Sequence, residues 1–202
     1  PLNGDALWYK DETKSEVTNN YGDAKQAIIG KATPDFYAGL RNTFSYKNIS
    51  LNVQFYTAWG GKIYDTWSRF TNSDGSRSLS TSGNVSRGTY ERRWQQPGDI
   101  TDVPRFVYGN SQSGRSSMSS SRFVYDGSYI RLREAELAYT FGENLKSQLG
   151  IHSLRVFLKG NNLWTYVKDK RLERDPEAGI DGRLNQEIPI GRTVFLGVNV
   201  SF

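Results

Sequence analysis

Long stretches of this chain alternate between apolar and polar residues, and this pattern limits the possible folds more than any other feature. In the closing stretch at 192–202, every second side chain from Val194 to Phe202 is apolar, so these side chains would share one face of an extended strand. Period-2 alternation is typical of a β-strand with one apolar face. The pattern recurs in residues 35–47, 49–60, 128–141 and 153–166. We therefore expect an all-β fold of antiparallel strands.

The segments between these strands alternate in length. A tight turn at Lys47 and a turn at residues 142–152, with room for a short helix, are brief, whereas the other connections are long and polar. Short turns at one end and long loops at the other are typical of bacterial outer-membrane barrels. We predict extracellular loops at 1–34, 61–126 and 167–191, a barrel hairpin at 35–60, barrel strands with a periplasmic turn at 127–166, and a closing strand at 192–202.

Membrane helices are excluded by the sequence, because it has no run of 18 or more apolar residues. Transmembrane strands need no such run, since only one face of each strand meets lipid. Five strands cannot close a barrel, because bacterial barrels begin at about 8 strands. The expected protein is therefore a multi-pass barrel of the cell outer membrane, of which this chain is one piece, with outer-membrane lipid and the remainder of the same barrel as its partners.

Aromatic residues fall at two levels of the predicted strands. These are the levels at which a barrel carries its two interfacial girdles. The alternative is cross-strand aromatic pairing in a soluble sheet. The expected outer girdle comprises Trp59, Tyr129 and Trp164, and the expected inner girdle comprises Tyr46, Tyr139 and Phe141.

The upper half of the strand at 128–141 has charges at both odd and even positions. Arg131 and Arg133 are at odd positions, and Glu134 and Glu136 are at even positions. Strict alternation would place charges on both faces, so we expect this end of the strand to project beyond the lipid.

Composition argues against several other functions. The chain has 202 residues, no Cys and one His, which excludes disulfides and thiolate metal sites. No Ser/His/Asp set, phosphate-binding loop or metal-ligand spacing is present, so we predict no enzyme, no cofactor and no metal. The net charge of +5 is scattered among carboxylates, so we expect no nucleic-acid partner. A basic RNA-binding domain, the alternative, would lose affinity on Arg122→Glu.

Two groups of residues are candidates for contact with a ligand or a partner. Aromatic side chains of the long loop could stack on a ligand or pack within the loop, and polar side chains on the strands are expected to face the barrel lumen. A third group, Glu173, Asp175, Glu177 and Asp181, is more simply explained as a solvated polar loop than as acid/base or calcium chemistry. The loop candidates are Trp67, Tyr90 and Trp94, and the lumen candidates are Arg41, Gln54, Arg155 and Lys159.

An ordered set of motifs resembles the late barrel of SusC/RagA-type TonB-dependent transporters. The motifs are Gly-Lys-Ala-Thr-Pro-Asp-Phe-Tyr-Ala-Gly-Leu at 30–40, Asn-Thr-Phe-Ser-Tyr-Lys at 42–47, Asp-Gly-Ser-Tyr-Ile-Arg-Leu-Arg at 126–133, Leu-Arg-Val-Phe at 154–157, Gly-Asn-Asn-Leu-Trp-Thr at 160–165 and Asp-Pro-Glu at 175–177. The resemblance implies the C-terminal part of a plugged barrel of about 22 strands. It also implies import of an oligosaccharide or peptide, a SusD-like surface lipoprotein as partner, and TonB acting through an N-terminal region outside these residues. The first loop, with Asp-Glu-Thr-Lys-Ser at 11–15, lacks the acidic run that suggests calcium in many members.

The closing strand resembles the C-terminal signal by which the barrel-assembly machinery recognises outer-membrane barrels. Gly197, Val200 and the terminal Phe202 carry this resemblance.

A secreted β-sandwich carbohydrate-binding module is the alternative for the whole chain. It would bury Val198 and Leu158, which a barrel exposes to lipid.

Overall fold

The computed structural model describes residues 3–72, 74–75, 84–107 and 115–202. The chain divides into two compact units, one formed by residues 1–31, 63–125 and 179–187 and the other by residues 32–62, 126–178 and 188–202. Each unit is described by itself below.

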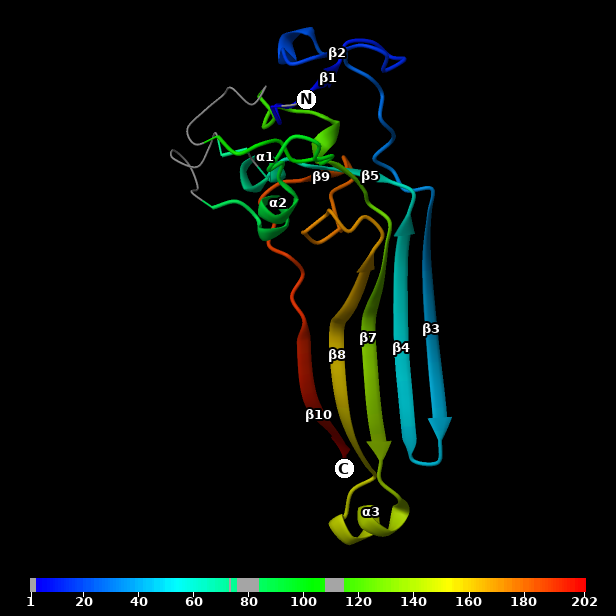
Figure 1. Ribbon diagram of the computed structural model, residues 1–202. Helices are drawn as coiled ribbons and strands as arrows, with labels where there is room; N and C mark the ends of the chain where they lie inside the picture. Colours follow the sequence, from blue (N-terminus) through cyan, green and yellow to red (C-terminus); the bar gives the residue numbers. More distant parts are fainter. Residues whose placement is uncertain (1–2, 73, 76–83, 108–114) are drawn as a thin grey trace. The chain divides into compact units, whose positions relative to one another are not determined.

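A five-stranded antiparallel sheet forms most of the second unit (Figure 1). Its strand order is β10-β8-β7-β4-β3, so each strand of this sheet lies beside the strand of the sheet that precedes it in the chain. The strands are β3 (Phe36–Tyr46), β4 (Ile49–Trp59), β7 (Tyr129–Thr140), β8 (Ser153–Val167) and β10 (Thr193–Ser201). The all-β prediction with antiparallel strands is confirmed for this unit.

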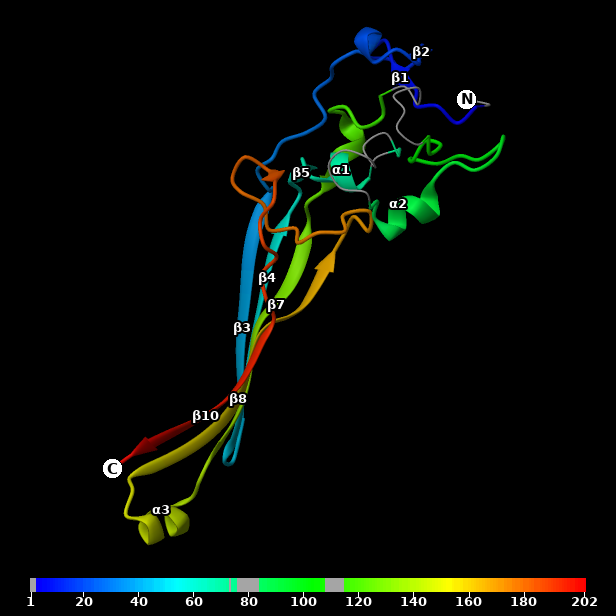
Figure 2. The ribbon, with the colours of Figure 1, turned by 90° about the vertical axis from the view of Figure 1, so that its left-hand side faces the viewer.

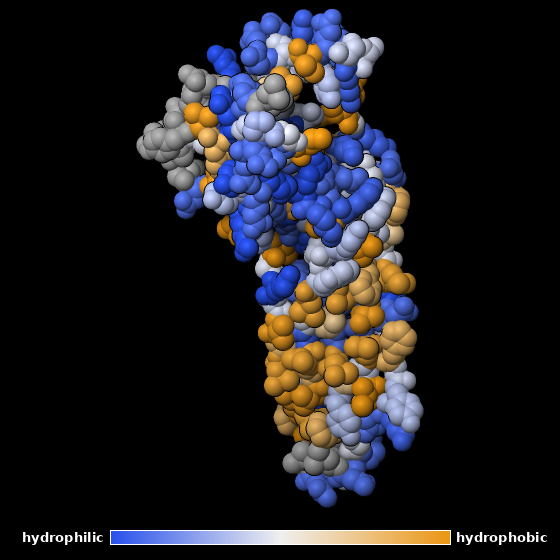
Figure 3. Space-filling model, viewed as in Figure 1, coloured by the Kyte–Doolittle hydropathy of each residue, from blue (hydrophilic) through white to orange (hydrophobic). Residues whose placement is uncertain are grey.

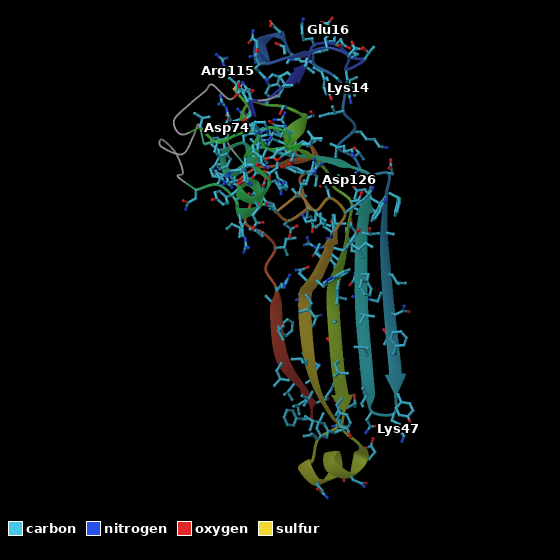
Figure 4. All side chains as sticks on the ribbon, in the orientation of Figure 1. Lys14, Glu16, Lys47, Asp74, Arg115 and Asp126 are labelled. Carbon is cyan, nitrogen blue, oxygen red and sulfur yellow. The ribbon has the colours of Figure 1, made fainter. Side chains whose placement is uncertain are left out.

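Two connections at the same end of the sheet are short. The β3–β4 turn consists of Lys47 and Asn48, and Lys47, labelled in Figure 4, has a φ of 51°, a left-handed conformation that closes a tight hairpin. The turn between β7 and β8 contains α3 (Glu143–Leu149), as the sequence predicts for 142–152. Figure 2, a view along the sheet, shows that β8 and β10 twist away from β3 and β4. Such twist is the normal consequence of L-residue backbone sterics.

A β-bulge in β7 corrects the expectation that this strand carries charges on both faces. The register shifts between Leu132 and Glu134, so Arg131 lies opposite Tyr56 while Glu134 lies opposite Gln54. Residues 54 and 56 share a face of β4, so the extra residue brings the charges on either side of the bulge to one face. The other face of β7 is left apolar through Leu132, which lies opposite Phe55.

The first unit has little regular structure. It contains β1 (Trp8–Tyr9), β2 (Val17–Thr18), η1 (Tyr21–Asp23), β5 (Lys62–Asp65), α1 (Ser68–Thr71), α2 (Arg87–Arg92), η2 (Ser121–Phe123), β6 (Val124–Asp126) and β9 (Arg183–Leu184). Strands β6, β5 and β9 form a small sheet in which β5 and β9 are parallel. Its apolar core is small and includes Ile63, Val103, Phe123, Tyr125 and Leu184. Within the described residues, no helix is long and apolar enough to cross a membrane.

Arg122 holds the irregular segments of this first unit together. Its guanidinium donates hydrogen bonds to the carbonyl oxygens of Asp102, Ser116 and Asn72, at 3.1, 3.1 and 2.8 Å. Nearby, the Ser116 hydroxyl donates to the buried carboxylate of Asp74 at 2.6 Å. Hydrogen bonds to backbone therefore replace a larger apolar core here. Arg122→Glu would disrupt this folding, so the variant cannot test nucleic-acid binding.

Candidate functional site: the two faces of the five-stranded sheet

One face of the sheet is apolar across all five strands, as the orange side chains in Figure 3 show. The cross-strand register aligns leucines and a phenylalanine into a continuous row, formed by Phe44, Leu51, Leu137, Leu158 and Leu196. All five side chains in this row are exposed. Contiguous exposed apolar surface of this size marks an interaction with lipid or protein.

The β-sandwich alternative requires this apolar face to be buried. In the described part of the chain, the face is exposed. Leu158 is 50% exposed and Val198 is 57% exposed. A sandwich core would cover both side chains, whereas a lipid-facing barrel wall leaves both accessible.

Aromatic side chains lie at both ends of this apolar face. At the end near the short turns, Tyr46 and Tyr139 lie one strand apart on either side of Ile49, and the ring of Phe141 meets that of Tyr139 edge-on at 4.9 Å. At the opposite end, Phe36 pairs with Trp59, and the rings of Trp164 and Tyr166 are stacked at 6.5 Å. Aromatic residues therefore border the face at two levels, the arrangement expected of interfacial girdles.

Tyr129 differs from the other predicted girdle residues. It lies opposite Ala58 on the polar face and is only 4% exposed. Its ring packs 6.2 Å from that of Tyr56 instead of pointing outward. The prediction that Tyr129 belongs to the outer girdle is therefore wrong, because residue 129 is in register with the residues of the polar face. Tyr166 takes its place on the apolar face.

The distance between the two aromatic rows matches a bilayer. The 11 residues of β4 separate the Ile49 row from the Trp59 row, a rise of about 33 Å along the strand. A tilt of about 40° reduces this to a height of about 25 Å, the height of the apolar band of outer-membrane barrels.

The opposite face carries a row of ion pairs. Glu134 accepts contacts from Lys159 at 2.7 Å and from Arg41 at 3.8 Å, and Arg41 also donates a hydrogen bond to Gln54 at 2.9 Å. On the same face, Arg155 donates a hydrogen bond to Glu136 at 2.5 Å. The four lumen candidates from the sequence thus share this face. Arg155 and Lys159 are largely engaged by carboxylates, while the side chain of Arg41 is 59% exposed.

A second set of ion pairs attaches the segment after β8 to this polar face. Arg131, whose side chain is 1% exposed, contacts Asp175 at 2.6 Å and Glu177 at 3.2 Å. Glu177 also contacts Arg133 at 2.8 Å, and the Arg133 guanidinium lies over the ring of Tyr56. Asp175 and Glu177, whose side chains are 21% and 33% exposed, therefore pair with two arginines instead of pointing freely into solvent. Local pattern could not predict these pairs, because the partners lie 44 or more residues apart in the sequence. No group of three or more potential metal ligands occurs in the described residues.

Of the predicted assembly residues, Gly197 and Val200 lie in the edge strand β10, and Phe202 directly follows this strand. Gly197 lies opposite Phe157, and a Cβ atom at this position would fall 2.2 Å from the Phe157 ring. The ring therefore covers the glycine, which explains the need for glycine here by packing alone. Val200 and Phe202 are 45% and 86% exposed. Their role in assembly stays a prediction.

The three loop aromatics lie in different settings within the first unit. Trp67 packs on Phe70 at 4.8 Å, and the Trp94 ring lies against the backbone of Gly4, whose φ is 73°. Tyr90 is 53% exposed, with the Arg93 guanidinium over its ring at 3.8 Å. Packing within the first unit therefore accounts for Trp67 and Trp94, and Tyr90 keeps an accessible surface.

Comparison with known proteins finds similar sequences among bacterial receptors. The chain is 31% identical over 210 residues to the TonB-dependent receptor P26 of Formosa agariphila and 30% identical over 190 residues to its TonB-dependent receptor P3. These alignments cover 96% and 89% of this chain but 19% and 17% of the relatives. The TonB-dependent receptor SusC of Bacteroides thetaiotaomicron is 26% identical over 178 residues. No family model matches the chain.

Among solved structures, the RagAB peptide transporter is similar, with a TM-score of 0.77 and 26% identity. The match covers 99% of this chain and 21% of the matched chain. The chain thus spans about a fifth of the length of the proteins that it matches. All of these relatives are named as receptors or transporters.

Proposed function

We propose, from the premise that this chain is homologous to SusC/RagA-type TonB-dependent receptors along most of its length, that it forms part of the wall of an outer-membrane nutrient importer. The two-faced sheet is the observation that carries this proposal. Its exposed apolar face, bordered by aromatic residues, faces lipid, and its face of ion pairs faces a hydrated lumen. The rest of a barrel of about 22 strands completes the wall.

Adjacent residues of β8 provide a sharp test of the two faces. Leu158 and Lys159 are neighbours but lie on opposite faces. These 202 residues contain no cysteine, so once any cysteine elsewhere in the full-length protein is replaced with serine, each position can be probed with one introduced thiol. In intact cells that express the full-length protein, we expect Lys159→Cys to react with a water-soluble maleimide and Leu158→Cys to react only with a membrane-partitioning one. Equal reactivity of both thiols toward the water-soluble reagent would reject the lipid-facing assignment.

The imported substrate is proposed to be an oligosaccharide or a peptide. A lumen of alternating charge suits a hydrated ligand, and the exposed guanidinium of Arg41 is the most available donor on this face. Deleting the full-length gene should abolish uptake of one such substrate, measured with fluorescent oligosaccharides and peptides, and deleting TonB should have the same effect. Unchanged uptake of all probes in both strains would reject the import function.

A SusD-like surface lipoprotein is the proposed partner of the loops, alongside TonB and the barrel-assembly machinery for the whole protein. Three isoleucines of the first unit, Ile28, Ile100 and Ile180, are almost fully exposed, at 99%, 102% and 98%. Apolar side chains this accessible are suited to contact another protein. Replacing the three with Asp should reduce co-purification of the lipoprotein. Replacing three exposed lysines with Asp, as a matched control, should not. Undiminished co-purification of the isoleucine variant would remove these residues from the interface.

A further inference from the structure

Lysine side chains accompany the aromatic residues at the end of the apolar face opposite the short turns. The Lys168 ammonium lies over the ring of Trp59 at 5.3 Å, and the Lys170 ammonium lies over the ring of Tyr166 at 4.2 Å. Both rings belong to the apolar face, since Trp59 pairs with Phe36 and Tyr166 lies opposite Ile130. The ammonium groups are therefore held at the boundary of the apolar surface.

This boundary has an excess of positive charge. Residues 168–171 read Lys-Asp-Lys-Arg, and Lys62 and Asp126 adjoin them, which gives four cations and two carboxylates. Lys62 and Lys168 share one oxygen of Asp126, at 3.6 and 3.0 Å, and Arg171 engages Asp169 at 2.7 Å. Asp126 is labelled in Figure 4.

Lys170 is the least neutralised of these cations. No carboxylate of the described residues forms an ion pair with its ammonium group, which lies over the Tyr166 ring. Both carboxylates of the cluster remain charged at neutral pH. The Arg171 hydrogen bond lowers the pKa of Asp169. Partial burial would raise the pKa of Asp126, but hydrogen bonds from Ser128 and Lys168 outweigh it and lower the pKa to about 2.

We propose that this cluster, Lys62, Lys168, Lys170 and Arg171, binds the phosphate groups of a phosphorylated glycolipid of the lipid A type in the outer leaflet. Acyl chains lie on the adjoining apolar face, and the phosphates lie at the level of the Trp59 and Tyr166 rings. The inference rests on the proposed membrane location, because only a lipid-facing surface would bring the apolar face into contact with acyl chains and the cation cluster into contact with phosphates. An anionic headgroup near such lysines gains electrostatic attraction that a neutral lipid does not.

The test uses the full-length protein, purified in a mild detergent. Before any binding measurement, each variant is checked for a heat-modifiable folded band in the outer-membrane fraction. Loss of that band in the wild type would reject the membrane location itself, which separates failure of the proposed function from failure of this inference.

The binding probes are diphosphoryl lipid A, enzymatically dephosphorylated lipid A and inorganic phosphate. Their affinities are measured by microscale thermophoresis. Lys170→Gln should weaken diphosphoryl lipid A binding about fivefold at low ionic strength, the factor for about 1 kcal/mol per lysine. Lys47→Gln is the matched control, since Lys47 lies over the Tyr46 ring at 5.4 Å at the other end of the face. It should leave the affinity unchanged.

Several outcomes would overturn the inference. These are equal binding of phosphorylated and dephosphorylated lipid A, equal affinities of wild type and Lys170→Gln, or an equal loss in Lys47→Gln. Inorganic phosphate that competes as well as lipid A would show that an anion, and not a lipid, is recognised.

Discussion

Replacing Val53 with arginine should destabilise the folded protein strongly, because Val53 lies near the middle of the apolar face. Val53 is opposite Asn42 and Ala135, two rows from the row of Ile49 and Tyr139. Four residues along a tilted strand correspond to a depth of about 10 Å of the approximately 25 Å band. Arginine at such a depth costs about 2–4 kcal/mol.

Leu158→Arg should cost less than the value for mid-bilayer. Leu158 lies opposite Leu137, one row from Tyr139 and therefore only about 5 Å from the aromatic level. Since the penalty falls to about 0–1 kcal/mol at the interface, we expect about 1–2 kcal/mol for this variant.

Asn52→Arg is the matched control on the polar face. Asn52 is the chain neighbour of Val53, but it lies opposite Glu136 and its amide donates a hydrogen bond to Glu134. An arginine there meets two carboxylates, so the change in stability should be close to zero.

The assay is urea unfolding of the full-length protein in phospholipid vesicles. The folded fraction at each urea concentration is measured from the heat-modifiable band on a gel. The expected order of destabilisation is Val53→Arg, then Leu158→Arg, then Asn52→Arg. A negligible effect of Val53→Arg, or an effect of Asn52→Arg of the same size, would refute the assignment of the two faces.

The remaining predictions concern single positions in the same full-length protein. Arg131→Met should destabilise the protein by about 1–3 kcal/mol in urea unfolding because it removes the ion pair of the partly buried Asp175 carboxylate; a change below about 0.5 kcal/mol would contradict this. Gly197→Ala should lower the amount of assembled protein because of the clash with Phe157, and a second change, Phe157→Ala, should restore it. Asp126, whose pKa is lowered from 3.8 to about 2, should contribute about 1–2 kcal/mol above pH 4 that is lost between about pH 4 and pH 2. The unfolding free energies of wild type and Asp126→Asn should therefore converge near pH 2. Deleting Phe202 should reduce outer-membrane assembly on an immunoblot, and normal levels would count against an assembly signal.

Local pattern was enough to predict the strands of the sheet. The stretch at 35–47 became β3 (Phe36–Tyr46), and 49–60 became β4 (Ile49–Trp59), because alternation along a strand reports directly which side chains share a face. The same parity places Arg41 and Gln54 on one face and Leu158 on the other. These features depend only on near neighbours in the sequence.

Other features depended on contacts between distant segments. The bulge at Arg133 changes which residues of β7 share a face, and the residue type at that position does not predict a bulge. Tyr129 was misplaced because its aromatic character agrees with a girdle while its position in the alternation does not.

The sequence by itself determined that the chain forms amphipathic antiparallel strands with short turns at one end, because these follow from side-chain periodicity and turn chemistry. Only the tertiary structure decided what holds the irregular segments. Arg131 binds Asp175 and Glu177 from 44 and 46 residues away, and Arg122 binds three carbonyl groups from separate segments. Buried ion pairs and hydrogen bonds of this kind have no periodicity, so they are fixed only when the chain brings the two partners within a few ångströms of each other.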